Sequence, residues 1–125
     1  MGPLLGVFLG GGLGALCRYG VGVWAGRLLP DARVPWGTFS VNVAGCFVLG
    51  ALVPLFAVRL SWPAPVRLAV TTGFLGGLTT FSTFGQESVA LASRAPALGL
   101  ANVALNVGVG LAAATLGMWL GGRLT

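Results

Sequence analysis

The sequence is poor in the side chains that carry most enzyme chemistry. It has no histidine and no lysine, only two cysteines, and only two acidic residues, Asp31 and Glu87. Zinc sites and acid–base catalysis therefore lack the side chains that they ordinarily use. Cys17 and Cys46 lie in apolar stretches without metal-ligand spacing, so we interpret them as small hydrophobic residues rather than a disulfide. These absences argue against an enzyme.

Charge is scarce throughout the chain. Of 125 residues, 56% are hydrophobic and only 7% are charged, and the mean hydropathy is +0.95. Soluble domains carry about 25% charged residues, so this composition predicts an all-α integral membrane protein. A span needs about 20 apolar residues, and four spans would use nearly the whole chain as one domain, residues 1–125. The first apolar stretch lacks a basic leading segment, so we do not expect a cleaved signal peptide.

Four apolar stretches are separated by short loops rich in proline and charge. The third stretch is longer than a simple crossing, which predicts a helix that breaks and restarts around Gly76–Thr80. Gly6, Gly10 and Gly14 recur at every fourth position, a stripe that suits close helix packing and, we expect, the contact face of a dimer. The predicted spans are Leu4–Trp24, Trp36–Val58, Val66–Ser93 and Ala97–Leu120.

The seven arginines stand singly near the ends of spans, as interfacial anchors do, which argues against nucleic-acid binding. With four spans, both termini share a side with the second loop. Each side then carries the same number of loop arginines, so the positive-inside rule gives no orientation. We therefore expect a dual-topology chain that pairs as an antiparallel dimer. The two sets are Arg59, Arg67 and Arg123 on one side, and Arg27, Arg33 and Arg94 on the other.

The segment Thr71–Glu87 is unusually polar for a membrane span, with three glycines between its hydroxyl residues. Hydroxyls can bond backbone groups that a helix break has freed, and such irregular backbone is tolerated where it lines a wet cavity. Carbonyls freed around Gly76–Thr80 could hold a small cation, and on a dimer axis two copies would suit a buried sodium ion.

The remaining polar groups in the spans are mostly neutral donors, with Glu87 the nearest carboxylate. A cation pathway usually needs carboxylates or converging carbonyls, whereas amides, hydroxyls and an arginine favour a small anion. Phe81 and Phe84 share a helix face, and the positive edges of two rings could meet such an anion.

Each of these residues also has a purely structural interpretation. Asn42, Asn102 and Asn106 could simply bond neighbouring helices. The two phenylalanines could be ordinary core or lipid-facing aromatics. Arg18 lies near a predicted span end and could reach the interface, and Glu87 could pair with an arginine there.

Three motifs carry a resemblance to a known family. The motifs GGLGALCRYG at Gly11–Gly20, WGTFSVNVAGCFVLG at Trp36–Gly50 and GFLGGLTTFSTFGQE at Gly73–Glu87 resemble those of the Fluc (CrcB-type) fluoride channels. The resemblance runs in order across three of the four spans. It implies an antiparallel homodimer with two pores that exports fluoride passively across a prokaryotic plasma (inner) membrane, as a multi-pass protein.

The resemblance also implies roles for individual residues. Asn42 corresponds to the pore asparagine, and Phe81 and Phe84 to the pore phenylalanines. Arg18 corresponds to a structural arginine of the first span, and the carbonyls of Gly76 and Thr79 correspond to ligands of a structural sodium ion. The remaining pore positions are the hydroxyls Ser82 and Thr83, the vestibule residues Thr38 and Glu87, and the fourth-span residues Asn102 and Asn106.

The fourth span departs from the family pattern, which commonly has a tyrosine and then a serine where this chain has Asn102 and Asn106. A polar track survives with altered chemistry, and a non-conducting subunit of a heterodimer stays open as an alternative. A small dual-topology proton-coupled exporter is the other alternative, although the first span has no acid and Glu87 falls late in the third.

Overall fold

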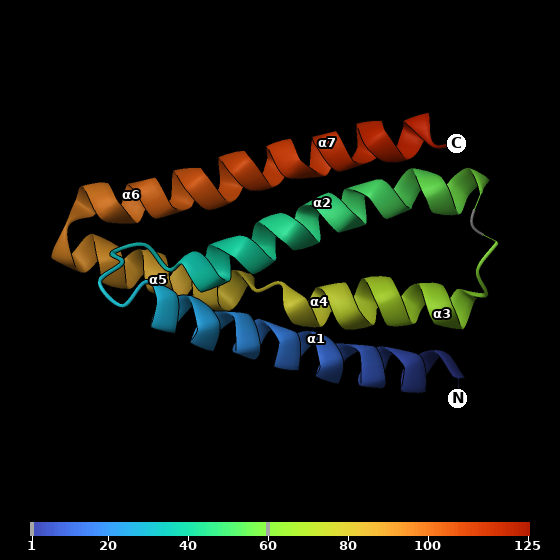
Figure 1. Ribbon diagram of the computed structural model, residues 1–125, viewed down its shortest axis with the longest axis horizontal. Helices are drawn as coiled ribbons and strands as arrows, with labels where there is room; N and C mark the ends of the chain where they lie inside the picture. The colour runs from blue at the N-terminus through green and yellow to red at the C-terminus, as the bar shows by residue number, and fades with distance from the viewer. Residues whose placement is uncertain (1, 60) are drawn as a thin grey trace.

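The computed structural model describes residues 2–59 and 61–125, and their regular structure is entirely helical. Four helical rods lie side by side, joined by short connections (Figure 1). The third and fourth rods each consist of several segments. In chain order the elements are α1 (Gly2–Leu28), α2 (Trp36–Val58), α3 (Ala64–Leu68), η1 (Ala69–Leu75), α4 (Gly76–Leu78), α5 (Phe81–Arg94), α6 (Pro96–Ala104), η2 (Leu105–Val109) and α7 (Gly110–Arg123).

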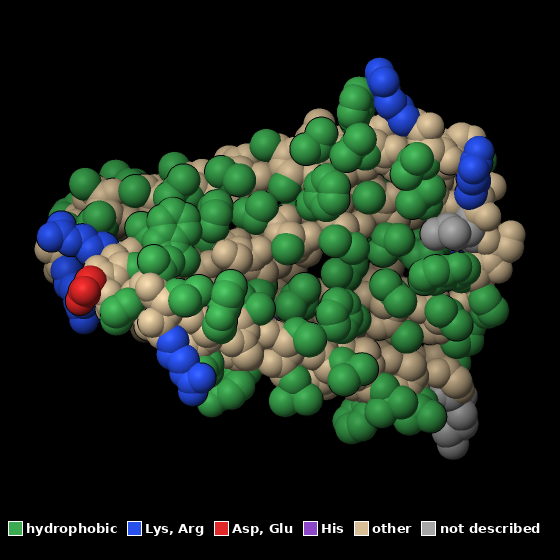
Figure 2. Space-filling model, viewed as in Figure 1, with side chains coloured by type: hydrophobic (Ala, Val, Ile, Leu, Met, Phe, Trp, Pro, Cys, Tyr) green, Lys and Arg blue, Asp and Glu red, His purple; other side chains and the backbone are tan. Residues whose placement is uncertain are grey.

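Three of the rods are long and apolar enough to cross a membrane, namely Gly2–Leu28, Trp36–Val58 and Pro96–Arg123. At most 17% of the residues in each apolar window are buried inside the chain, so most of these residues keep some exposed surface. Figure 2 shows hydrophobic side chains over the middle of the molecule, with basic groups toward its two ends. An apolar belt with charged ends fits a bilayer, and the predicted all-α, multi-pass membrane protein is confirmed.

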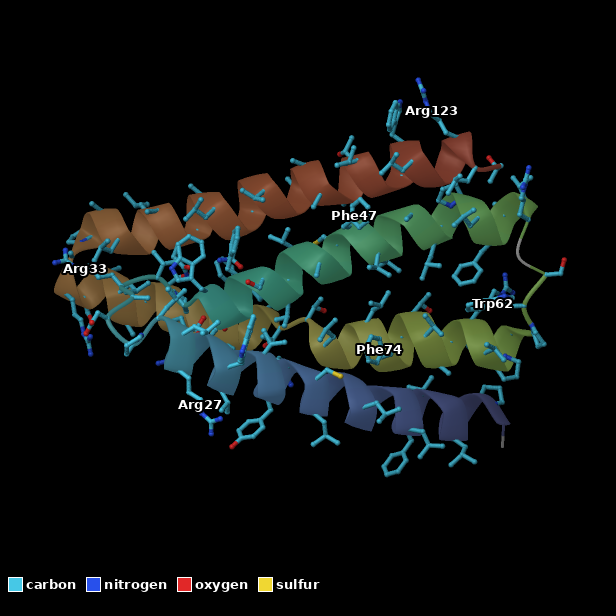
Figure 3. All side chains as sticks on the ribbon, viewed as in Figure 1. Arg27, Arg33, Phe47, Trp62, Phe74 and Arg123 are labelled. Carbon is cyan, nitrogen blue, oxygen red and sulfur yellow. The ribbon has the colours of Figure 1, made fainter. Side chains whose placement is uncertain are left out.

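The two ends of the molecule carry the connections as the four-span prediction requires. Both termini and the α2–α3 connection lie at one end, and the α1–α2 and α5–α6 connections lie at the other (Figure 1). Arg33 lies at the second end and Arg123 near the first (Figure 3). The loop arginines are therefore divided between the two ends as the sequence predicts.

Glycines bring the rods together in two close pairs. On α1, a Cβ added to Gly10 would collide with the carbonyl of Ala69, and one added to Gly14 would collide with that of Phe74. The α2–α7 pair is packed in the same way, since a Cβ on Gly117 would collide with the carbonyl of Phe47. The glycine stripe thus packs within the chain. The expectation that it forms the contact face of a dimer is wrong, because the third rod already covers it.

The third rod is interrupted at only two residues, fewer than the predicted Gly76–Thr80. Thr79 (φ −83°, ψ 157°) and Thr80 (φ −152°, ψ 118°) are extended, whereas Gly76–Leu78 is helical. The glycines just before the break serve close packing instead of unwinding. A Cβ on Gly77 would collide with the carbonyl of Gly11 in α1, which only a bare helical backbone can approach so closely.

Two π-helical segments, η1 and η2, flank this region from different rods. A π-helical turn widens the helix, and such turns are frequent at functional sites. Neither segment is predicted by the sequence, because a change of hydrogen-bond register leaves the apolar composition of a span unchanged. Both contribute residues to the site, namely Thr71 and Leu75 from η1 and Asn106 from η2.

Candidate functional site

The centre of the site is the side chain of Asn42 on α2, which forms hydrogen bonds with the third rod at its break. Its Oδ1 accepts a hydrogen bond from the backbone N–H of Thr80 at 2.8 Å, and its Nδ2 donates to the carbonyl oxygen of Thr80 at 3.2 Å. Thr80 is 7% exposed, so its backbone groups have little access to water. A buried backbone group without a partner costs about 1–3 kcal/mol. Asn42 therefore supplies the partners that the interrupted helix cannot.

The hydroxyl of Thr80 closes the other side of the break. It caps α5 by accepting the backbone N–H of Thr83 at 3.2 Å, as N-terminal threonines commonly do. The same oxygen lies 3.0 Å from Thr83 Oγ1, to which it donates, and 3.3 Å from Ser82 Oγ. Ser82 and Thr83, the two predicted pathway hydroxyls, thus cluster with Thr80 at the start of α5.

A chain of side-chain hydrogen bonds runs from Asn42 to the interior of the α5–α6 pair. Asn42 Nδ2 also donates to Asn106 Oδ1 at 3.2 Å, and Asn106 Nδ2 donates to Asn102 Oδ1 at 3.2 Å. Asn102 Nδ2 then donates to Ser88 Oγ at 2.9 Å, and Ser88 donates to the carbonyl of Phe84 at 2.7 Å. We call these residues, Asn42, Asn106, Asn102 and Ser88, the amide relay.

Asn102 is fully buried, and Asn106 is 8% exposed. Asn102 and Asn106 are four residues apart in the sequence, a spacing that predicts one shared helix face, and their hydrogen bond confirms it. Asn102 bonds across to α5, as the structural interpretation of the sequence has it, while Asn106 borders a cavity. Sequence reasoning missed Ser88, although a serine one turn after Phe84 and on the same face was a usable signal.

A cavity of about 340 Å³, here called the amide cavity, lies beside the break. Phe81 and Phe84 both border it, and their rings meet edge to face with centroids 5.5 Å apart, which confirms that they share a face. Phe84 is only 7% exposed, whereas Phe81 is 82% exposed. The cavity's main lining residues are Asn42, Thr79, Thr80, Phe81, Phe84 and Asn106.

A second cavity, of about 550 Å³, lies on the other side of Thr80 and contains Arg18; we call it the arginine cavity. Glu87 borders it, and Glu87 Oε1 accepts a hydrogen bond from Thr38 Oγ1 at 2.9 Å. Glu87 Oε2 is buried and has no hydrogen-bond partner among the residues that the structure describes. Thr80 lines both cavities, so the helix break separates two hollows that meet at one residue.

Arg18 lies farther from the end of its helix than the sequence predicts. The first helix continues to Leu28 rather than ending near Trp24, so Arg18 is ten residues, or about 15 Å, from the end of the helix. That its side chain reaches the membrane interface stays a prediction. Arg18 borders the arginine cavity, together with the hydroxyl residues Thr38 and Thr83.

The break also deprives the carbonyls of the last turn before it, residues 76–79, of their helical donors. The Thr80 N–H, which would bond the Gly76 carbonyl in a continuous helix, goes to Asn42 Oδ1. The Thr83 N–H, which would bond the Thr79 carbonyl, goes to Thr80 Oγ1. These are the two carbonyls that the sequence analysis associates with a sodium ion. Within residues 2–59 and 61–125, no group of three or more His, Cys, Asp or Glu offers an alternative metal site.

The fold and the site together define a class of protein. It is a small multi-pass helical membrane protein with two cavities that share one lining residue, Thr80, at a broken helix. A model of the family described as "CrcB-like protein, Camphor Resistance (CrcB)" matches residues 5–118, and the chain belongs to this family. The membership confirms that the chain is not an enzyme.

Curated relatives cover nearly the full chain. A protein of Chloroflexus aurantiacus is 43% identical over 132 residues, spanning 98% of this chain and 100% of the relative. One of Rhizobium etli is 46% identical over 113 residues, spanning 90% of each chain. One of Acidobacterium capsulatum is 43% identical over 115 residues, spanning 92% of this chain and 89% of the relative. Each of these relatives is named "Fluoride-specific ion channel FluC".

Replacing Asn42 with alanine should destabilise the break. Asn42→Ala leaves the N–H and carbonyl of Thr80 without partners, which should cost about 1–3 kcal/mol. We expect a lower melting temperature in detergent and faster hydrogen–deuterium exchange across residues 76–84. The matched control is Thr115→Val, because that exposed hydroxyl bonds only the carbonyl of Leu111 in its own helix. Unchanged exchange in Asn42→Ala would show that the helix break holds without the amide.

Proposed function

We propose that the protein is a fluoride-selective passive channel that exports fluoride across a bacterial plasma membrane. The observation that carries the proposal is the meeting of the amide and arginine cavities at Thr80, in a chain whose relatives are named fluoride-specific ion channels. The surroundings are mostly neutral polar groups, aromatic rings and one arginine, with Glu87 the one carboxylate, and this balance suits a small anion. Passage of an ion requires no side chain that reacts, so the selectivity rests on geometry.

The two cavities suggest a division of labour along the pathway. Arg18 attracts anions into the arginine cavity, where the hydroxyl of Thr83, which accepts from Thr80 and keeps its own hydrogen, can replace water. At the break the ion passes Thr80 into the amide cavity, where the ring edges of Phe81 and Phe84 carry partial positive charge. Glu87 repels anions, and its hydrogen bond from Thr38 keeps one carboxylate oxygen occupied.

A second subunit is part of the proposal. Phe81 borders the amide cavity, yet it is 82% exposed in the single chain, so one side of the cavity has no wall. An antiparallel homodimer would cover it and, by its two-fold symmetry, would form two such pores. The equal division of the loop arginines between the two ends supports insertion in both orientations.

A structural sodium ion fits the backbone of the break. The carbonyls of Gly76 and Thr79, freed as described above, would hold it, and a symmetry-related pair from the second subunit would complete four oxygens. Such an ion would neutralise the converging carbonyl dipoles and tie the subunits together.

Fluoride efflux from liposomes tests the channel. With valinomycin and K⁺ to balance charge, we expect fast fluoride release and no chloride release. Phe81→Ile and Phe84→Ile should each slow release by roughly tenfold or more, equivalent to about 1.4 kcal/mol of barrier, while Phe8→Ile, an exposed ring on α1, should not. Release that requires a pH gradient would favour the proton-coupled exporter, and no release from well-folded dimers would favour a heterodimer subunit.

Topology mapping tests the antiparallel pairing. A protease-sensitive tag at the C-terminus should be cut from outside intact cells in about half of the molecules, because the chain has no charge bias. Adding three lysines after Arg123 should shift that fraction strongly toward the cytoplasm. A wild-type tag found on a single side of the membrane would rule out dual topology.

Exchange of the cation tests the sodium site. The melting temperature of the purified protein should rise with Na⁺ concentration, because an ion that binds only the folded state stabilises it by mass action. N-methyl-D-glucamine chloride at matched ionic strength serves as the control, and K⁺ reports size selectivity. Equal melting temperatures in all three salts would contradict the sodium site.

A further inference from the structure

The three asparagines of the chain are Asn42, Asn102 and Asn106, and all three belong to the amide relay. The relay starts from a fixed acceptor, the carbonyl oxygen of Phe84, which can only accept. Ser88 must therefore donate its hydroxyl proton to that carbonyl, and its oxygen is left to accept from Asn102 Nδ2. The orientation of Asn102 is set by this contact.

The same logic orients the next two amides. With its Nδ2 on Ser88, Asn102 turns Oδ1 and its backbone carbonyl toward Asn106, whose Nδ2 donates to both at 3.2 and 3.1 Å. Asn106 Oδ1 must then face Asn42, and it accepts from Asn42 Nδ2. All the donors along the relay thus point away from Asn42 and toward Phe84.

This arrangement consumes both amide hydrogens of Asn42. A carboxamide has two N–H groups, and those of Asn42 go to the Thr80 carbonyl and to Asn106 Oδ1. No amide hydrogen of Asn42 is left for an ion in the amide cavity. An anion that binds Asn42 must first replace one of these two acceptors.

The two acceptors are not equally easy to replace. The Thr80 carbonyl is held in register by the reciprocal 2.8 Å bond from its own N–H to Asn42. Asn106, by contrast, meets Asn42 through a single side-chain hydrogen bond, and it stands in the π-helical segment η2 on the wall of the amide cavity. Asn106 Oδ1 is therefore the acceptor that an entering anion displaces.

We propose that Asn106 is an internal competitor that occupies one N–H of Asn42 until fluoride displaces it, and so sets the fluoride concentration at which this position fills. Fluoride is a far stronger hydrogen-bond acceptor than chloride, so it can displace an amide oxygen where chloride cannot. The proposal rests on the proposed channel function and adds a source of selectivity at the same site.

Side-chain NMR of protein labelled with ¹⁵N-asparagine tests this directly, because it yields only three amide pairs. Replacing chloride by fluoride at constant Na⁺ should shift the Asn42 pair saturably. Asn106→Leu keeps a branched side chain of similar shape but removes the hydrogen-bond acceptor. In this variant the midpoint, which is the fluoride concentration at half-saturation, should fall by about fivefold, the factor that corresponds to one neutral hydrogen bond. Val109→Leu, in the same segment, should leave the midpoint unchanged.

The outcomes separate this inference from the channel itself. Equal midpoints in wild type and Asn106→Leu would overturn the competitor role, even if wild-type liposomes release fluoride. If liposomes with the wild-type protein release no fluoride, the proposed function fails. Spectra recorded without fluoride still test the hydrogen bond between Asn42 and Asn106, because loss of Asn106 should move one Asn42 N–H signal upfield. Asn106→Ala carries the same expectations and replaces the leucine variant if that protein does not fold. If the role of Asn106 were purely structural, its replacement would lower the stability of the protein without changing the fluoride concentration at half-saturation.

Discussion

The structure depends on one side chain, Asn42, which supplies the hydrogen-bond partners that the third rod lacks where its helix is interrupted. In an apolar surrounding, a helix can be broken only if its freed backbone groups find partners in the protein. Asn42 meets both groups of Thr80 with one carboxamide, and the Thr80 hydroxyl caps the helix that follows. Every other feature of the site follows from that contact, because the break creates the free carbonyls, divides the two cavities and starts the helix that carries both phenylalanines.

The contact also ties function to stability. Asn42 can bond the backbone at the break and also donate a hydrogen bond to an ion only if the ion can replace one of its present partners. The structure provides one fixed bond pair, to Thr80, and one adaptable bond, to Asn106. Close glycine packing holds α2, which carries Asn42, against α7 at Gly117. The adaptable bond is made by a residue of the π-helical segment η2.

The sequence predicted the features that composition and spacing report. The second span has its predicted bounds, Trp36–Val58, because hydropathy marks where a helix meets water. The break was predicted from the length of the third span, although its extent was not, since Gly77 serves packing against α1. A glycine stripe shows that a close neighbour exists but not which one, so its assignment to a dimer contact failed. Ser88 was missed because its importance comes entirely from Asn102, which approaches it from another helix.

A relay of this kind behaves as a unit, and its members cannot be ranked by single substitutions. Asn102 is fully buried, so water cannot replace a lost partner there, and hydrogen bonds in such surroundings strengthen one another. Removing Ser88 would free Asn102 to turn, which would in turn release the orientation of Asn106 and expose Asn42. Effects at neighbouring members should therefore be non-additive. The departure of the fourth span from the family pattern is then a change of the whole relay, in which two asparagines on α6 and η2 act together with a serine on α5.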